Sequence, residues 1–289
     1  MRPTRLSHLR RFPNRVGPYV RFTYIDLFVF SNSEMFVRRV TQAGVTGVVV
    51  DWERRGKRRR QAGADTQINR DTPADLAAVR SAAPTAQILC RVNQWSRWTA
   101  SEIELAISLG ADEVLLPMVR RPDEVDAALT AVAGRCGLGI LVETTDAVRR
   151  VAELVEWPLS RVYVGLNDLM IDRGGGCLFG ALVDGTVEHV ARATAAANLP
   201  FGVAGLTVPE GGHPVPCRLI MGALASLGAS FTFLRRSFHA DVSGRDVGVE
   251  VPRILAAVEG ARHRTPTQIG TDAADLAAAV GLLTEDEAV

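Results

Sequence analysis

Short apolar runs alternate with longer segments of mixed polarity along most of the chain. The apolar runs are rich in β-branched residues and nearly continuous, which is typical of strands buried on both faces of a parallel sheet. This pattern predicts eight strands, at residues 27–30, 47–50, 88–92, 113–116, 139–142, 161–164, 201–204 and 231–234.

The segments between these runs carry helix signals. Thr72 and Pro73 open one helix with proline in its first turn, and Gly110 and Gly134 stop two others. Eight alternating units in about 240 residues favour an α/β fold, a closed (β/α)8 TIM barrel, over an open doubly wound sheet. The other predicted helices cover residues 33–43, 101–109, 122–133, 145–155, 186–197, 216–227 and 249–262.

The barrel is expected to occupy residues 25–263, between two terminal segments. Residues 1–24 are arginine-rich and lack clear periodicity, so we interpret them as a basic extension. Residues 264–289 predict one more helix, with a loosely attached end favoured over a cover for a neighbouring subunit.

Bulk properties exclude several classes of protein. The formal net charge is +1, which argues against a dedicated nucleic-acid binder. No run reaches the roughly 18 apolar residues that a membrane span needs. Four widely spaced cysteines without a CxxC pair indicate no disulfide framework and no common zinc-finger site, so we expect a cytoplasmic protein.

Charged residues follow several predicted strands, at the end of the barrel where such proteins place their reactive groups. Glu143 and Asp168 follow neighbouring strands and match a site for one hard divalent cation. Equally, each acid can cap the helix that follows it. Arg91 can bind a substrate carboxylate or polarise a carbonyl as a catalytic residue, and it can form a structural ion pair with Glu53 or Glu143; both roles can hold together.

Five motifs carry a resemblance to a known family: VDWE at 50–53, CRVN at 90–93, GADEVLLPM at 110–118, LVET at 141–144 and VGLNDL at 164–169. In this order and spacing, from about residue 28 to residue 240, the chain resembles the HpcH/HpaI aldolase and citrate lyase β-subunit family.

The resemblance implies a (β/α)8 barrel and a class II aldolase or lyase that depends on Mg²⁺ or Mn²⁺. It implies that Glu143 and Asp168 bind the metal and that Arg91 binds substrate. The metal would chelate a 2-oxo acid such as pyruvate, and a C–C bond to an aldehyde partner would form or break through the enolate. Homo-oligomers, trimers or hexamers, are also implied. The other expected substrate-binding residues are Asn93, Pro117, Met118, Leu169, Arg54 and Lys57.

Arg54 departs from the family pattern, because the aldolases usually carry a histidine there and the citrate lyases an aspartate. Arginine cannot act as a base near neutral pH. The candidate replacements are a metal-bound water, Glu53, and the histidines His213 and His239, which follow the last two strands.

Two alternatives remain open at this stage. The basic run at 54–60 can bind the phosphates of a coenzyme A thioester, which would make the reaction citrate-lyase-like, or it can be a solvated loop. A barrel that binds metal and 2-oxo acid without turnover is the alternative that Arg54 favours.

Overall fold

The computed structural model describes residues 25–55 and 70–286. The basic extension, Lys57 and most of the basic run lie outside these residues, so the expectations for them stay predictions. Among the described helices, none combines the length and the apolar character that a bilayer crossing requires.

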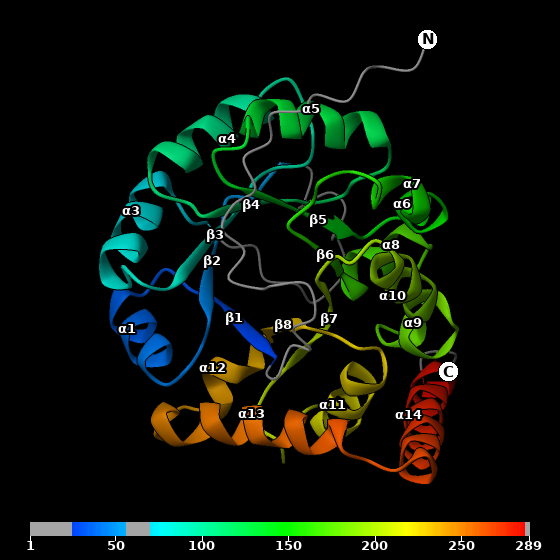
Figure 1. Ribbon diagram of the computed structural model, residues 1–289. Coiled ribbons are helices and arrows are strands. Elements are labelled where there is room, and N and C mark those ends of the chain that lie inside the picture. The colour runs from blue at the N-terminus through cyan, green and yellow to red at the C-terminus, as the bar shows by residue number, and fades with distance from the viewer. Residues whose placement is uncertain (1–24, 56–69, 287–289) are drawn as a thin grey trace.

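Eight parallel strands close into a barrel in sequence order, with β1 paired to both β2 and β8, and helices form a ring around it (Figure 1). The (β/α)8 prediction is therefore confirmed. The strands are β1 (Asp26–Phe30), β2 (Gly47–Asp51), β3 (Gln87–Arg91), β4 (Glu113–Leu116), β5 (Gly137–Val142), β6 (Arg161–Val164), β7 (Phe201–Leu206) and β8 (Phe231–Leu234).

The helices of the ring largely follow the predicted segments. Local signals explain their starts: Thr72 forms a capping box with Asp75, and Ser33 and Thr144 accept a backbone N–H as N-caps. The main helices are α1 (Glu34–Gln42), α3 (Pro73–Ala82), α4 (Thr99–Ser108), α5 (Pro122–Val132), α10 (Thr186–Ala196), α11 (Cys217–Ser226) and α13 (Val247–Arg262).

Several short helices differ from the prediction. The helix expected at 145–155 is broken at Arg150 into α6 (Thr145–Arg149) and α7 (Val151–Leu154). Three further short helices follow strands or helices where the sequence predicted loops, namely α8 (Leu166–Asp172), α9 (Gly180–Val183) and α12 (Ser237–Asp241).

The C-terminal tail is docked rather than loose. Its helix, α14 (Pro266–Asp286), lies beside α9 and α11 (Figure 1), and the side chains of Leu276 and Val280 are only 4% and 3% exposed. Arg264 pairs with Asp272 at its start. The expectation of a loosely attached end was wrong, because these two apolar residues are buried against the chain's own barrel.

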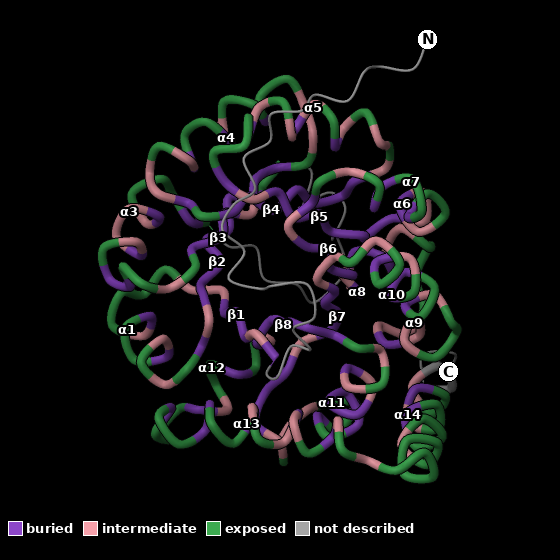
Figure 2. The backbone as a smooth tube through the Cα atoms, in the orientation of Figure 1, coloured by how far each residue is buried: buried purple, intermediate pink, exposed green. Residues whose placement is uncertain are grey.

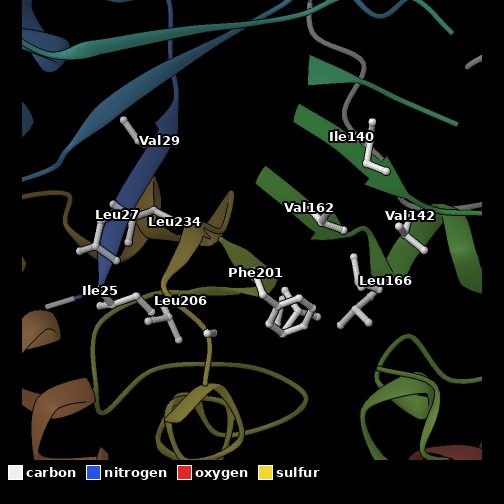
Figure 3. Packing of buried hydrophobic residues seen from close by; sticks show 14 of the residues in the cluster. Ile25, Leu27, Val29, Ile140, Val142, Val162, Leu166, Phe201, Leu206 and Leu234 are labelled. Atoms are coloured by element: carbon white, nitrogen blue, oxygen red, sulfur yellow. The ribbon is translucent and has the colours of Figure 1, made fainter. Parts of the chain in front are cut away.

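Between strands and helices lies the main hydrophobic core, built from the outward-facing strand residues and the inner faces of the helices. Figure 3 labels several of them, including Leu27 and Val29 of β1, Ile140 and Val142 of β5, and Leu206 of β7. The strands are buried almost throughout, whereas the helices expose their outer faces (Figure 2).

The barrel interior is filled by a separate cluster that is rich in aromatic rings. It contains Phe28, Phe30, Tyr163, Phe231 and Phe233 together with aliphatic residues from β2 to β5. The rings contact one another, with centroids 4.2 Å apart for Tyr163 and Phe233 and 5.1 Å for Phe30 and Phe233. This layer is a packed floor beneath the carboxyl ends of the strands.

Below that floor, an ion pair lies at the amino ends of the strands. Arg161 Nε is 2.7 Å from Glu113 Oε1, and both side chains are at least nine-tenths buried. The Arg161 guanidinium also lies over the rings of Phe28 and Phe231, at 4.5 and 4.8 Å from their centroids. Charge buried this deeply needs its partner, so the pair fixes this end of the barrel.

Candidate active site at the carboxyl ends of the strands

The two-residue repeat of the strands determines which side chains reach the mouth of the barrel. Side chains of a strand alternate between its two faces. The interior cluster contains Val49, Leu89, Leu141, Tyr163 and Phe233. Two residues further along the same strands stand Asp51, Arg91, Glu143, Gly165 and Arg235.

Arg91 is held by Asp51 in a bidentate ion pair. Its Nε donates to Asp51 Oδ1 at 2.9 Å and its Nη2 to Asp51 Oδ2 at 2.7 Å, while Nε is 3.5 Å from Glu53 Oε2. Its guanidinium lies over the Phe30 ring at 4.9 Å. Burial alone would lower the pKa of Arg91, but the carboxylates of Asp51 and Glu53 raise it well above its ordinary value.

Asp51 is a residue that the sequence reasoning missed. Of the two expected ion-pair partners of Arg91, Glu53 does pair with it, at 3.5 Å, but Asp51 makes both short contacts. It is fully buried and directly follows Val50, the residue that ends the apolar run. Counting two positions on from Val49 along the strand would have identified it.

Glu143 follows β5 and is buried, with 3% of its surface exposed. Its Oε2 accepts a hydrogen bond from the Met118 backbone N–H at 3.2 Å, and Met118 adopts a left-handed φ of 56° to present that group. Its carboxylate also lies against Gly165, where a Cβ would come within 2.3 Å of Oε1. The side chain is therefore held from two sides.

Asp168 lies in the first turn of α8 and is 5% exposed. It is close enough to Glu143 for its charge to matter: burial, together with the charges of Asp168 and Glu53, raises the pKa of Glu143 to about 8. The two acids predicted as metal ligands are thus brought together. Asp168 is also an acid in a first helical turn, so its helix-stabilising role holds as well.

This donor set fits one kind of metal site. Among residues 25–55 and 70–286, no three histidine, cysteine or acidic side chains are grouped as a metal cage. Magnesium, however, takes one or two protein carboxylates and leaves its other positions to water and substrate oxygens. Glu143 and Asp168 supply two such carboxylates, and their mutual repulsion in a buried setting favours a cation between them.

The loop after β2 is fixed by Asn93 and Arg54. Asn93 Oδ1 accepts from the N–H groups of Arg54 and Arg55, both at 2.8 Å, and Asn93 Nδ2 donates to Trp52 O at 3.1 Å and Glu102 Oε1 at 3.0 Å. These contacts occupy the amide of Asn93.

The Arg54 guanidinium, in turn, bonds the carbonyl groups of Arg70 and Asp71. The side chain of Asp71 accepts a hydrogen bond from the Asp51 N–H through Oδ2 at 2.8 Å. Burial raises the pKa of the Asp71 carboxyl. In this structure Arg54 and Asn93 hold the loop, and their substrate-binding roles stay predictions.

The two candidate histidines differ in position. His239 lies on α12 and bonds the Phe30 carbonyl through Nε2 at 3.1 Å, stacking on Phe36 at 4.4 Å. Because a carbonyl oxygen only accepts, Nε2 carries the hydrogen in this contact. His213 is exposed on the loop after β7. Only His239 contacts a residue of the barrel floor.

The remaining predicted substrate-binding residues are buried. Pro117 and Met118 lie at the end of β4, where Met118 contributes its backbone N–H to Glu143. Leu169 is fully buried in the outer core, and its N–H donates to Gly165 O at 3.1 Å. The Leu169 side chain therefore packs behind the site rather than facing its mouth.

Several solved structures have the same fold as this chain. The HpcH/HpaI aldolase from Desulfitobacterium hafniense DCB-2 has a TM-score of 0.56 at 14% identity, covering 84% of this chain and 95% of that one. An HpcH/HpaI aldolase/citrate lyase family protein from Burkholderia cenocepacia J2315 gives 0.57 at 16% identity, with coverage of 83% and 95%. RipC from Yersinia pestis gives 0.54 at 15% identity, with coverage of 86% and 99%.

At such low identity these structures support the fold alone. No protein of curated function matches the chain. The sequence model of the HpcH/HpaI aldolase/citrate lyase family matches residues 25–177, which carry the first six strands and Glu53, Arg91, Glu143 and Asp168. That match spans more than half of the chain, and the chain therefore belongs to the HpcH/HpaI aldolase/citrate lyase family.

Proposed function

We propose that this protein is a metal-dependent carbon–carbon lyase of the class II aldolase type. Its substrate would be a pyruvate-like 2-oxo acid. The bond between C3, the carbon next to the keto group, and the carbon of the partner would form or break through the enolate. The observation that carries the proposal is the buried group of acids Glu53, Glu143 and Asp168 beside Arg91 at the barrel mouth.

The arrangement suits binding of an anionic substrate beside a cation. Glu143 and Asp168 would hold a magnesium or manganese ion, which supplies Lewis-acid stabilisation of negative charge on the keto oxygen. Arg91 adds a fixed positive charge, and Asp51 and Phe30 keep its guanidinium in one orientation. Since Nε and Nη2 of Arg91 are bonded to Asp51, Nη1 is the part of the fork that would bind a substrate oxygen.

Proton transfer needs a base, because Arg54 stands where the family pattern has a histidine or an aspartate. Glu53 is the candidate that lies within the group of acids, 1% exposed and beside Arg91. The aromatic floor formed by Phe30, Tyr163 and Phe233 excludes water from below the site. We therefore assign proton transfer at the substrate to Glu53 in this proposal.

Exchange of the C3 protons of pyruvate in deuterated water tests the proposal without knowledge of the aldehyde partner. We expect exchange that requires Mg²⁺ or Mn²⁺ and is lost in Glu143→Gln and Asp168→Asn. Glu188→Gln, a change of the same kind on the exposed face of α10, is the matched control and should keep full exchange.

Two results would contradict the proposal. One is unchanged metal affinity in both acid variants. The other is metal-dependent pyruvate binding without any proton exchange, which would support the alternative of a binding protein without turnover.

A further inference from the structure

Asp172 links the helix that carries Asp168 to the strand end that carries Glu143. It is the last residue of α8 and lies one helical turn after Asp168, on the same face. Its Oδ2 accepts the backbone N–H of Thr145 at 2.8 Å and the Thr145 hydroxyl at 2.9 Å. Because Thr145 lies two residues after Glu143, these bonds join the two segments that supply the expected metal ligands.

Arg120 brings the loop after β4 into the same arrangement. Its Nη2 donates to Asp172 Oδ1 at 2.6 Å and its Nη1 to Asp146 Oδ2 at 3.2 Å. Met118, two residues earlier in this loop, donates its backbone N–H to Glu143 Oε2 at 3.2 Å. The guanidinium of Arg120 therefore connects the segment that holds the Glu143 carboxylate to the helix of Asp168.

The carboxylate of Asp172 is used by the chain itself. One oxygen accepts from Arg120 and the other from two groups of Thr145, and the side chain is only 12% exposed. Burial alone would raise the pKa of Asp172, but the hydrogen bonds from Thr145 and Arg120 hold it below its ordinary value. Asp172 is thus an ionised group whose two oxygens join three segments, rather than a third ligand facing the mouth.

The two expected ligands need such support. Glu143 and Asp168 are both buried, and the charge of Asp168 acts on Glu143 as a repulsion. Without links between their segments, this repulsion would move the carboxylates apart in the metal-free protein. Groups that orient metal ligands from behind are a large part of what sets metal affinity.

A second ion pair of the same form lies near the end of α8 and shows what a purely structural link would be. Asp184 Oδ2 accepts from Arg173 Nη1 at 2.6 Å, and its Oδ1 accepts the Thr186 backbone N–H at 2.9 Å. These bonds run to the start of α10 and to neither of the segments that follow β4 and β5. Asp184 therefore offers a matched comparison with Asp172.

We propose that Asp172 and Arg120 are positioning residues, which hold Glu143 and Asp168 at the separation that one divalent ion requires. The inference rests on the proposed function, since it takes these two acids to be the metal ligands. It adds a role for two residues that touch neither metal nor substrate.

Titration of the full-length protein with Mn²⁺, followed by calorimetry, tests this role. Asp172→Asn keeps the shape of the side chain and an oxygen for Thr145 but removes the ion pair with Arg120. We expect it to bind Mn²⁺ about 10- to 100-fold more weakly than the wild type. Asp184→Asn removes the matched ion pair and should keep the wild-type affinity. Thermal unfolding without metal should show a similar loss of stability in both variants, so stability alone would not separate them.

Arg120→Met removes the same ion pair from its more exposed partner and should also weaken Mn²⁺ binding, which keeps the test available if Asp172→Asn is unfolded. The double variant should bind Mn²⁺ about as weakly as Asp172→Asn alone, because the two residues act through one link. Wild-type affinity in the folded variants, or an equal loss in Asp184→Asn, overturns the positioning role and leaves the proposed function standing. If the wild type itself binds no Mn²⁺, the proposed function fails, and this inference with it.

Discussion

Replacing Gly165 with alanine should displace the Glu143 carboxylate without removing any functional group. Gly165 is the N-cap of α8 and has an ordinary negative φ of −88°, so alanine is not strained by the backbone itself. The obstacle is the neighbouring side chain: the new Cβ would lie 2.3 Å from Glu143 Oε1 and 2.5 Å from its Cγ.

The size of the displacement follows from these distances. Ordinary contact begins near 3.4 Å, so Oε1 must recede by about 1.1 Å (3.4 − 2.3). Glu143 is buried and its Oε2 is bonded to the Met118 N–H, so the carboxylate cannot move that far and keep this bond. Disturbing the support of a metal ligand typically lowers metal affinity about 10- to 100-fold, and we expect Gly165→Ala to fall in this range.

Titration with Mn²⁺, followed by calorimetry or by the electron paramagnetic resonance signal of the free ion, measures the effect. Gly260→Ala is the matched control, because a Cβ there meets no atom within 4 Å, and its Mn²⁺ affinity should be that of the wild type. Thermal unfolding shows whether each variant is folded. A folded Gly165→Ala protein with wild-type Mn²⁺ affinity would refute the position that we assign to Glu143 in the metal site.

Three further predictions follow from buried groups. The pKa of Glu143 is raised from 4.5 to about 8, so between these pH values the folded chain keeps a proton that the unfolded chain has lost. The metal-free protein should therefore lose stability as pH rises through this window, which melting at several pH values measures. The affinity for Mn²⁺ should rise up to about pH 8, which titration at the same pH values measures. Glu113→Gln should lower the free energy of unfolding by about 3–5 kcal/mol, because it leaves the buried guanidinium of Arg161 without its ion-pair partner. Glu188→Gln on the surface should change the free energy of unfolding by less than about 0.5 kcal/mol. Equal effects of the two changes in denaturant titrations would contradict this prediction. Leu276→Ala should destabilise the protein by about 2–5 kcal/mol, and Leu282→Ala, at a position 65% exposed, should not; a loose tail would make both changes neutral.

Much of the fold was predictable because the strands are buried on both faces. The limits predicted for β4, β6 and β8 coincide with those in the structure, since each is a short, fully buried run that is mostly apolar. The short helices α8, α9 and α12 were missed for the opposite reason. They have at most seven residues, too few for a helical repeat to show against the surrounding loop residues.

Residues of the site were predictable only where a charged side chain at the end of a single apolar run identified them. Glu143, Asp168 and Arg91 follow apolar runs and were identified in this way. The two-residue alternation along β2 points to Asp51, but its partner Arg91 is identified only when β2 meets β3. The engagement of Asn93 and Arg54 with loop backbone likewise depends on contacts 16 to 41 residues apart along the chain.

The aromatic floor has a kinetic consequence. The rings of Phe30, Tyr163 and Phe233 fill the interior, and the Arg161–Glu113 pair lies at the opposite end, so we expect no second route between the described strands. Whatever enters beside Arg91 must leave by the same opening. The reactant that binds deepest would therefore bind first and leave last. A non-reacting analogue of that reactant should not slow the release of a second reactant bound above it.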